Sequence, residues 1–534
     1  MFIQSRSVCC ILLAFGCSLI SIPLTAQKAK THALTADEAK IVKKDAATMF
    51  ASENYNGALK GYIDLQKSAP DNLDYNYKLG ICYLMTNAEK KKAVAPLEFV
   101  IHGKEPKKES WFYLGMAYLF SLQYDEAIQA FNHFKSFPGV KPVKDFLPVD
   151  RLLEMCSNGK LLVAQPIDVS FENLGKSINT IYDEYNPYIS ADGNQLVFTS
   201  RRKGNMGGFI EDLGIFTADV YWSTWKDTAW TKAKGLGGMT NTEWDEECVS
   251  VSPDGNQLFL YCDNAESYAD ISVSTLKGKM WQKPVLLNEQ VNSKGYEGAA
   301  CMSMDGSMII FSSTRKDGLG GSDLYTVKKE KNGEWGTALS IGSTLNTKYD
   351  EDAPFLSVNG KELYFSSKGH NSMGGYDVFR STWNESSSTW SAPVNVGYPF
   401  NDAEDNVFIS ISGDGRYAYV SAIRPEGFGE RDIYRVTFNN STGHDFNSVI
   451  NGSLVSLNGG KPEITRITLS DKNGLPVMDF KPGYTTNRFV LVAKPGTYSL
   501  KVEGYHFEPL TEELVIGDND TATIDKVISV NLSK

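Results

Sequence analysis

A short turn motif recurs five times in the middle of the chain and limits its fold more than any other feature. Each copy is a serine, a variable residue, Asp or Asn, and a glycine, at 190–193, 252–255, 303–306, 357–360 and 412–415. The glycines lie 62, 51, 54 and 55 residues apart. Asp-Gly and Asn-Gly supply the positive φ that a tight β-hairpin needs. The pattern predicts five similar hairpin units, and not catalytic aspartates.

Each unit also contains a later strand that begins with aspartate. The five aspartates are Asp219, Asp270, Asp323, Asp377 and Asp432. Four short antiparallel strands in each unit of about 50–60 residues, repeated around an axis, are typical of a β-propeller. The combined pattern resembles the PD40 (WD40-like, TolB-type) propeller repeat. This resemblance implies a five-bladed propeller over residues 164–438 and implies almost nothing about activity.

The last unit ends after its third strand, near Phe438. Residues 164–169 align with the fourth strands expected in two earlier units, at 282–286 and 391–395. We therefore expect the segment 164–169 to complete the last blade, so that no free sheet edge remains at the joint.

Acidic clusters precede the first strand of every unit. The candidate site residues among them are Asp245, Glu246, Glu297, Asp350, Glu351, Glu404 and Asp405. Fivefold closure would gather these carboxylates at one mouth of a central channel, where they could bind a cation or a basic peptide. Alternatively they accept hydrogen bonds from loop amides and pair with Arg201, Arg315, Lys368 and Arg424. Repetition in every unit favours this structural role.

Residues 35–160 show a different repeat. Alanines at 58, 93 and 127 are 35 and 34 residues apart, and the segment 111–118 has the spacing W-x2-L-G-x2-Y. This pattern resembles the tetratricopeptide (TPR) repeat, an α-solenoid in which small residues let paired helices approach closely. The stretch 143–157 is expected to form an added capping helix.

TPR geometry would place a row of apolar side chains on the concave side of the first helices. These side chains are Tyr77, Ile81, Leu84, Phe112, Met116 and Leu119. One interpretation is a groove for a partner peptide. The other is that these residues complete the core or pack against the propeller, because large exposed apolar patches are uncommon.

Residues 447–534 consist of short alternating segments separated by turns, which predicts a small antiparallel β-sandwich. The segments 451–454, 494–500 and 504–505 resemble the carboxypeptidase regulatory-like (transthyretin-like) domain. Two aspartates at 518 and 520 are interpreted as a turn and not as a calcium loop.

The first 26 residues are typical of a signal peptide. Arg6 precedes an apolar stretch from 8 to 22, and Ala26 stands at the expected cleavage point. The apolar stretch is shorter than the roughly 20 residues that span a bilayer. An alternative is lipidation at Cys17, which bulky Phe15 disfavours. No other segment predicts a membrane span.

Composition argues against several classes of function. The net charge of −11 and the absence of a run of Lys and Arg argue against nucleic acid as a partner. The cysteines that follow the signal peptide, and the six histidines, are dispersed and lack zinc-ligand spacing. We expect no metal and no cofactor.

The order of signal peptide, TPR array, PD40 propeller and regulatory-like sandwich resembles the PorE family of Bacteroidota. These are envelope proteins associated with type IX secretion. Members usually continue into an OmpA-like peptidoglycan-binding domain, for which this sequence has no counterpart, so direct peptidoglycan binding is not expected.

The resemblance implies a non-catalytic scaffold or adaptor in the periplasm, associated with the outer membrane, with envelope or secretion-machinery proteins as partners. The alternatives are a glycan-binding propeller and a hydrolase. The chain has no G-x-S-x-G elbow that would present a catalytic serine, although paired carboxylates on different blades could act on sugars.

Overall fold

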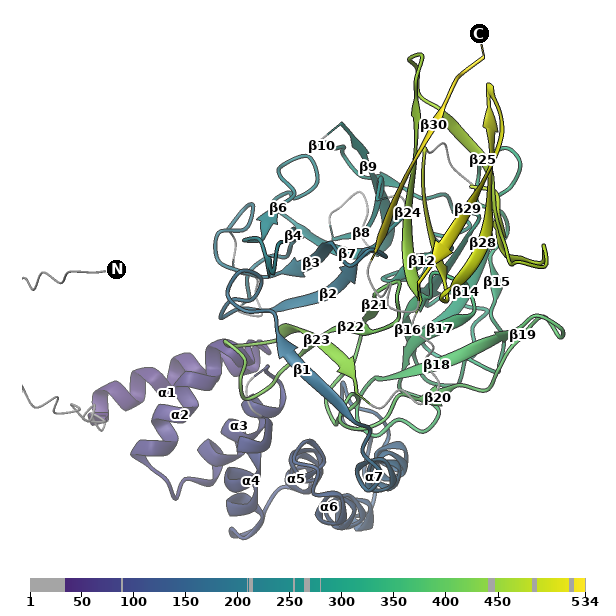
Figure 1. Cartoon of the computed structure of the whole chain (residues 1–534). Coiled ribbons are helices and arrows are strands. Elements are labelled where there is room, and N and C mark those ends of the chain that lie inside the picture. The colour runs from purple at the N-terminus through teal and green to yellow at the C-terminus, as the bar shows by residue number, and fades with distance from the viewer. Residues whose placement is uncertain are drawn as a thin grey trace, which may run out of the picture.

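The computed structural model describes residues 34–533 except 88–89, 209, 211–214, 253–254, 264–268, 279, 440–446, 483–486 and 518–522. The signal peptide, Cys17 and the predicted turn at 518–520 lie outside the described residues. Helices come first, followed by five β-sheets and then by two further sheets. In Figure 1 the helices and the last two sheets lie on opposite sides of the five sheets.

The helical array consists of seven α-helices and one short 3₁₀ helix. They are α1 (Ala36–Ala51), α2 (Tyr55–Ser68), α3 (Leu73–Leu84), η1 (Lys90–Ala93), α4 (Val94–Ile101), α5 (Glu109–Phe120), α6 (Tyr124–Ser136) and α7 (Val149–Val163).

Each α-helix of the array packs against the next one. A capping box formed by Thr35 and Glu38 starts α1. Glycines permit the closest approaches: a Cβ at Gly80 would lie 2.5 Å from Leu97, and one at Gly115 would lie 2.6 Å from Phe131. The small residues of the sequence repeat therefore serve helix packing.

The five middle sheets follow one another along the chain, and all their strand pairs are antiparallel. Sheet 1 contains β2 (Glu184–Ile189), β3 (Gln195–Ser200), β4 (Asp219–Lys226), β5 (Ala229–Trp230) and β6 (Lys234–Gly235). Sheet 2 contains β7 (Asp245–Val251), β8 (Gln257–Asp263), β9 (Asp270–Lys277), β10 (Met280–Trp281) and β11 (Val285–Leu286). Sheet 3 contains β12 (Ala300–Met302), β13 (Met308–Ser313), β14 (Asp323–Lys328) and β15 (Leu339–Ser340).

The last two of these sheets are built in the same way. Sheet 4 contains β16 (Glu351–Leu356), β17 (Glu362–Ser367), β18 (Asp377–Asn384), β19 (Thr389–Trp390) and β20 (Val394–Asn395). Sheet 5 contains β21 (Ile409–Ile411), β22 (Tyr417–Ala422), β23 (Asp432–Phe438) and, from the start of the region, β1 (Val169–Asn173).

The five sheets contact one another in cyclic order. The first strand of each sheet contacts the next sheet, and β2 of sheet 1 also contacts β21, β22 and β23 of sheet 5. We call this assembly the ring. Its fold is rich in β-sheet and propeller-like.

The strand predicted to cross the joint is present, but its position was predicted wrongly. The segment expected to pair was 164–169, whereas β1 pairs with β23 from Val169 opposite Phe438 to Asn173 opposite Tyr434. The prolines at 166, 284 and 393 suggested the alignment. Asn173 of β1 is instead equivalent to Asn395 of β20, because the side chain of each accepts the N–H of a glycine two residues later.

The C-terminal sheets form a sandwich around one core. One sheet contains β24 (Ser448–Ser456), β27 (Arg488–Ala493) and β30 (Ile524–Val530), and the other contains β25 (Glu463–Ser470), β26 (Pro476–Phe480), β28 (Gly496–Tyr505) and β29 (Phe507–Ile516). The β24–β30 pair is parallel, so the sandwich is not wholly antiparallel as predicted. Asn451 binds Asp192 at 3.0 Å, which places the sandwich at the end of the ring that carries the hairpin turns.

The aspartate that begins the third strand of each sheet is buried at four of the five positions, Asp219, Asp323, Asp377 and Asp432. One carboxylate oxygen of each accepts a backbone N–H from the loop before the strand. The other oxygen has no hydrogen-bond partner among the described residues. Burial raises the pKa of Asp219 to about 6 and that of Asp377 to about 8.

These aspartates should make stability fall as pH rises. The pKa of Asp377 in the folded protein exceeds its ordinary value of 3.8, so the folded state holds this proton more tightly than the unfolded chain does. The stability that this proton contributes is fully present below about pH 4 and is lost as pH rises through about 8.

Asp377→Asn removes the charge and keeps an oxygen that can accept from the N–H of Met373 and the amide of Asn395. Because one pKa unit corresponds to about 1.4 kcal/mol, the wild-type Tm should fall several degrees more than the variant's between pH 5 and 9. Differential scanning fluorimetry measures both. Exposed Asp71→Asn is the control, and an unchanged pH slope in Asp377→Asn would refute the assignment.

Candidate functional site

Five equivalent segments at one end of the ring hold the predicted acidic residues. We call the segments 179–184, 241–246, 292–297, 346–351 and 401–406 the mouth loops. Each begins with an asparagine whose side chain accepts an N–H from the third strand of the preceding sheet and donates to a carbonyl of that strand. These asparagines fix the loops to the sheets.

The glutamate that ends four of the mouth loops is fully buried. Its carboxylate accepts hydrogen bonds from the hydroxyl and the backbone N–H of the Thr or Ser four residues earlier, at Glu184, Glu246, Glu297 and Glu351. Burial still raises the pKa of Glu246 and Glu351 to about 7. Three predicted site residues, Glu246, Glu297 and Glu351, thus close their own loops.

The fifth mouth loop exchanges the two partners. Asp402 stands at the threonine position and Asn406 at the glutamate position. The N–H of Asp402 donates to the side-chain oxygen of Asn406 at 2.8 Å, as in the other loops, whereas the side-chain amide of Asn406 donates back to the Asp402 carboxylate at 3.3 Å. The predicted Glu404 lies inside this loop, and its equivalent in sheet 4 is Tyr349. Sequence spacing did not reveal Asn406 because the donor–acceptor pair is inverted there.

The fifth residue of four mouth loops is an aspartate that joins neighbouring sheets. Asp183, Asp245, Asp350 and Asp405 each accept the N–H of the residue that precedes the third strand of the preceding sheet. Two of them also pair with predicted cations, because Asp245 lies 3.0 Å from Arg201 and Asp350 lies 3.0 Å from Lys368.

The other two predicted cations behave differently. Arg315 approaches Glu297 only to 3.8 Å and stacks on Phe311 and Tyr325. Arg424 pairs with Glu426 at 3.0 Å and lies over the ring of Phe171, so its predicted pairing with a mouth carboxylate is wrong.

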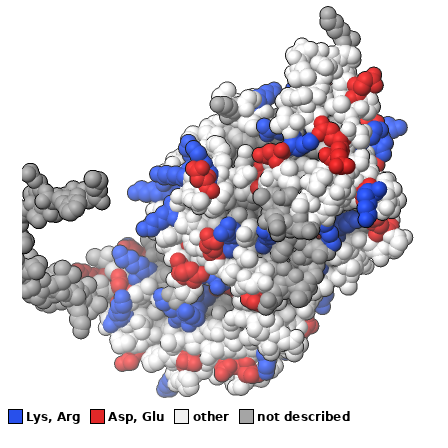
Figure 2. All heavy atoms as spheres, in the orientation of Figure 1, with Lys and Arg blue, Asp and Glu red and all other residues white. Residues whose placement is uncertain are grey.

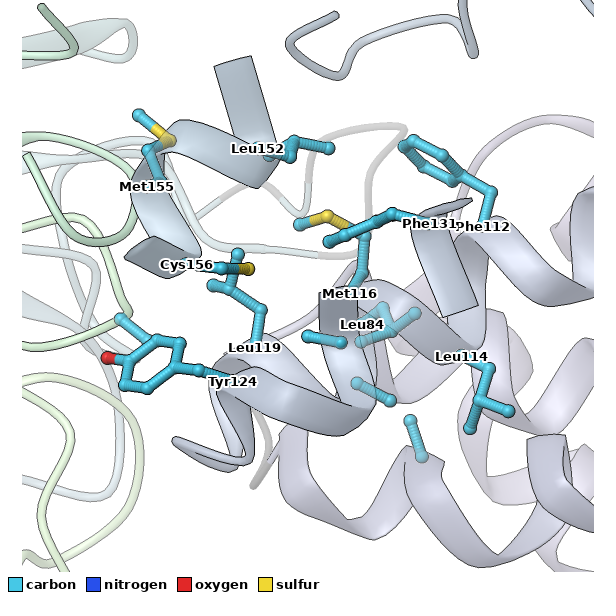
Figure 3. Close-up of a cluster of buried hydrophobic side chains, with 14 of the residues drawn as sticks. Leu84, Phe112, Leu114, Met116, Leu119, Tyr124, Phe131, Leu152, Met155 and Cys156 are labelled. Atoms are coloured by element: carbon cyan, nitrogen blue, oxygen red, sulfur yellow. The ribbon is translucent and has the colours of Figure 1, made fainter. Parts of the chain in front are cut away.

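The helical array covers part of this mouth. Five of the predicted groove residues are at most 5% exposed: Ile81, Leu84, Phe112, Met116 and Leu119. Phe146 from the segment before α7 lies 5.2 Å from the ring of Phe112. Figure 3 shows Cys156 of α7 beside Leu119 of α5. Leu84, Phe112, Met116 and Leu119 belong to an apolar cluster that also contains residues of α7 and of the ring.

Tyr77, the sixth predicted groove residue, is partly buried. Its ring meets that of Tyr113 edge to face at 6.0 Å, and the ammonium group of Lys107 lies over it at 4.7 Å. It belongs to α3.

A buried arginine attaches α7 to sheet 4. The guanidinium of Arg151 donates to the carbonyls of Lys368, Gly369 and His370 and to the hydroxyl of Ser372. Its planar group also lies 4.8 Å from the ring centre of Tyr349. Met373 and Ala403 of the ring are buried in the same apolar cluster as Leu152, Met155 and Cys156. The helices and the ring therefore share a core.

A cavity of about 460 Å³ lies between the array and the mouth loops. It brings together residues from both predicted sets, namely Leu84, Met116, Leu119, Glu404 and Asp405. Lys90 of the array pairs with Glu404 at 2.7 Å. Burial raises the pKa of Glu404, and the charge of Lys90 opposes this rise. The remaining cations of the cavity are Lys368 and Arg431.

A larger cleft of about 900 Å³ lies at the other end of the ring, below the sandwich. Trp222 of sheet 1 and Trp281 of sheet 2 contribute to its walls, and Asn451, Arg488 and Asp525 of the sandwich contribute polar groups. No periodic signal in the sequence identifies Trp222, because the other sheets have no tryptophan at the equivalent position.

The described part of the chain contains no group of three His, Cys, Asp or Glu side chains placed to hold a metal ion. None of the described helices combines the length and apolar character needed to cross a membrane. Figure 2 shows positive and negative side chains interspersed over the face in view, without a large patch of one sign.

No protein-family model matches the chain, and no curated protein matches it. Among solved structures, TolB from Acinetobacter baumannii is similar over 56% of this chain and 71% of its own, at 12% identity and a TM-score of 0.32. The α-L-arabinofuranosidase from Lactobacillus brevis is similar over 57% of this chain and 95% of its own, at 9% identity and a TM-score of 0.31.

Xylan β-1,4-xylosidase from Bacillus halodurans C-125 is similar over 68% of this chain and 95% of its own, at 9% identity and a TM-score of 0.33. Similarity at this level supports no statement about the activity or partners of the present chain.

Arg151 should hold the array on the ring. Arg151→Met keeps an unbranched apolar stem but leaves three carbonyls and a hydroxyl without this donor, which should cost about 3 kcal/mol of unfolding free energy. Urea unfolding measures this loss. The control is Lys160→Met on the exposed side of the same helix, where a surface ion pair with Asp125 is lost. Equal losses in the two variants would show that Arg151 is not the anchor.

Proposed function

We propose that this chain is a non-catalytic scaffold that is exported to the periplasm, associates with the outer membrane and holds protein partners. In this proposal residues 35–160 form a TPR array, residues 164–438 a five-bladed PD40-type propeller, and residues 447–534 a carboxypeptidase regulatory-like sandwich. Supporting observations are the cyclic contacts of the five sheets and the close packing of the helices at Gly80 and Gly115.

The observation that carries the proposal is how the mouth carboxylates are used. The glutamates close loops, and the aspartates accept N–H groups from neighbouring sheets. A catalytic acid or base needs an oxygen that can reach a substrate. Carboxylates that accept hydrogen bonds within the framework in every repeat fit a structural role better than a catalytic one.

Partners in the envelope or in a secretion machinery follow from the resemblance of the domain order to the PorE family. A scaffold also needs a stable relative position of its modules. The shared core between α7 and sheet 4 and the bond between Asn451 and Asp192 support such a position.

The scaffold proposal predicts complexes without turnover. Cross-linking of the full tagged chain in envelope fractions, followed by size-exclusion chromatography and mass spectrometry, should recover it in discrete assemblies. A chain recovered only as a free monomer would contradict the proposal. So would hydrolysis of envelope peptides or glycans that Glu247→Gln abolishes, because Glu247 lies at the mouth and binds the hydroxyl of Tyr185 at 2.6 Å.

Glycan binding is a second candidate function, favoured by one observation. Trp222 and Trp281 belong to adjacent sheets and line the same cleft with polar groups of the sandwich. Indole faces and polar side chains together suit sugar rings.

If the cleft binds glycans, neutral oligosaccharides should change the tryptophan fluorescence of the full chain, and Trp222→Ala should weaken their binding at least tenfold. Trp383→Ala is the control, because Trp383 lies in sheet 4 and outside this cleft. Equal weakening by the two substitutions, or no binding at millimolar concentrations, would reject this function.

A further inference from the structure

Two junctions between neighbouring sheets are built alike but are covered differently. In sheet 4 the N–H of Met373 donates to Asp377, and in sheet 1 the N–H of Met206 donates to Asp219, both at 3.0 Å. A glycine follows each methionine. The two methionines therefore occupy equivalent positions in the repeat.

The glycines confirm this equivalence because each packs on the next mouth loop. A Cβ at Gly374 would lie 2.5 Å from the Cα of Ala403, and one at Gly207 would lie 2.8 Å from the Cα of Glu243. Ala403 and Glu243 are the third residues of their mouth loops. The junction between sheets 4 and 5 thus corresponds to the junction between sheets 1 and 2.

The junction between sheets 4 and 5 is occupied by a helix. Met373 and Ala403 are buried in the cluster that contains Leu152 and Met155 of α7, and Arg151 donates to the hydroxyl of Ser372, the neighbour of Met373. This contact shows what the repeated loops can accept, namely an α-helix with apolar side chains and one basic side chain.

The junction between sheets 1 and 2 has no such cover among the described residues. Met206 is 45% exposed, Met239 53% and Trp244 51%. A Cβ at Gly238 would lie 3.4 Å from the terminal methyl group of Met206, so the loops that carry these side chains adjoin. Clustered exposed apolar side chains mark interaction sites, whereas single ones do not.

The charge at this junction is also specific. Glu243 replaces Ala403, is exposed, and makes no hydrogen bond or ion pair with any described residue. Within the surrounding apolar side chains, this carboxylate would favour a basic side chain of a partner.

We propose that Met206, Met239, Trp244 and Glu243 form a docking seat for an amphipathic helix of a protein partner. The apolar face of that helix packs on the two methionines and the tryptophan, and an arginine or lysine pairs with Glu243. This proposal rests on the scaffold function and names the chemistry of one partner surface.

The third equivalent junction provides a control. Leu319 of sheet 3 is 55% exposed at the position of Met206, but a lysine, Lys348, stands at the position of Glu243. A basic helix should not bind there.

The experiment uses a fluorescein-labelled synthetic peptide of residues 146–165, which contains α7, as the probe helix. In the full chain the junction between sheets 4 and 5 already holds α7, so the peptide is expected to bind at the junction between sheets 1 and 2. Fluorescence anisotropy should show a Kd in the micromolar range. Met206→Ser with Trp244→Ser should weaken binding at least tenfold, and Leu319→Ser should leave it unchanged.

Charge reversal tests the ion pair. Glu243→Lys should weaken binding of the peptide more than Glu243→Gln does, and added salt should reduce the difference. Circular dichroism and Tm values confirm that the variants fold. No binding, or equal loss in Leu319→Ser, would overturn the docking seat.

Self-association provides a further outcome. Sedimentation velocity tests whether the full chain dimerises and whether Met206→Ser with Trp244→Ser abolishes the dimer. Such a result would show that the docking seat binds a second copy of the chain, and it would contradict the proposal of a helical partner. If the peptide does not bind the docking seat but the cross-linked envelope assemblies are still recovered, the docking seat is rejected and the scaffold function is not. Loss of the assemblies with retained peptide binding would reject that function alone.

Discussion

The hydrogen bonds from backbone N–H groups to mouth carboxylates are the constraint on which the rest of the structure depends. The chain passes from each sheet of the ring to the next by a single connection. Among the described residues, no strand of one sheet pairs with a strand of another. Asp245 accepts the N–H of Ala218, and Asp350 accepts that of Ser322. These bonds give the partly buried acids hydrogen-bond partners and tie each mouth loop to the preceding sheet.

The same loops also determine where the helices attach. Repetition gives every junction a similar surface, and substitutions at a few positions distinguish one junction from another. In the fifth mouth loop the inverted pair of Asp402 and Asn406 keeps the loop closed, while Glu404 is available to pair with Lys90 of the array. A framework built from repeats can therefore differ at its surface without losing the bonds that hold it together.

Sequence periodicity predicted the elements within each unit more successfully than the contacts between units. The five turns and the five aspartates anticipated five separate sheets, and the missing last strand anticipated the pairing of β1 with β23. The position of β1 was wrong because short proline segments aligned more clearly than the asparagines that set the register. That the helical array is a TPR array and that the ring is a five-bladed propeller remain proposals.

The attachment between the modules could not be predicted. Arg151 and Ser372 are 221 residues apart, and nothing in the local sequence of α7 distinguishes Arg151 from a surface arginine. The candidate groove could be predicted only in part, for the same reason. Its apolar residues were identified from the sequence, but whether a partner or the chain itself covers them depends on packing between modules. The mouth acids were recognised by their repetition in the sequence, but their hydrogen bonds depend on loops from neighbouring sheets.

The most direct test of this account is the unfolding free energy of Asp245→Ala. Removal of this carboxylate leaves the N–H of Ala218 without its acceptor and Arg201 without its closest acidic partner. A structural role predicts a loss of about 2–4 kcal/mol in urea unfolding, because the N–H of buried Ala218 loses its acceptor and the largely buried Arg201 loses one of its two acidic partners. Unchanged stability, accompanied by the loss of a measurable turnover or of cation binding, would contradict the account.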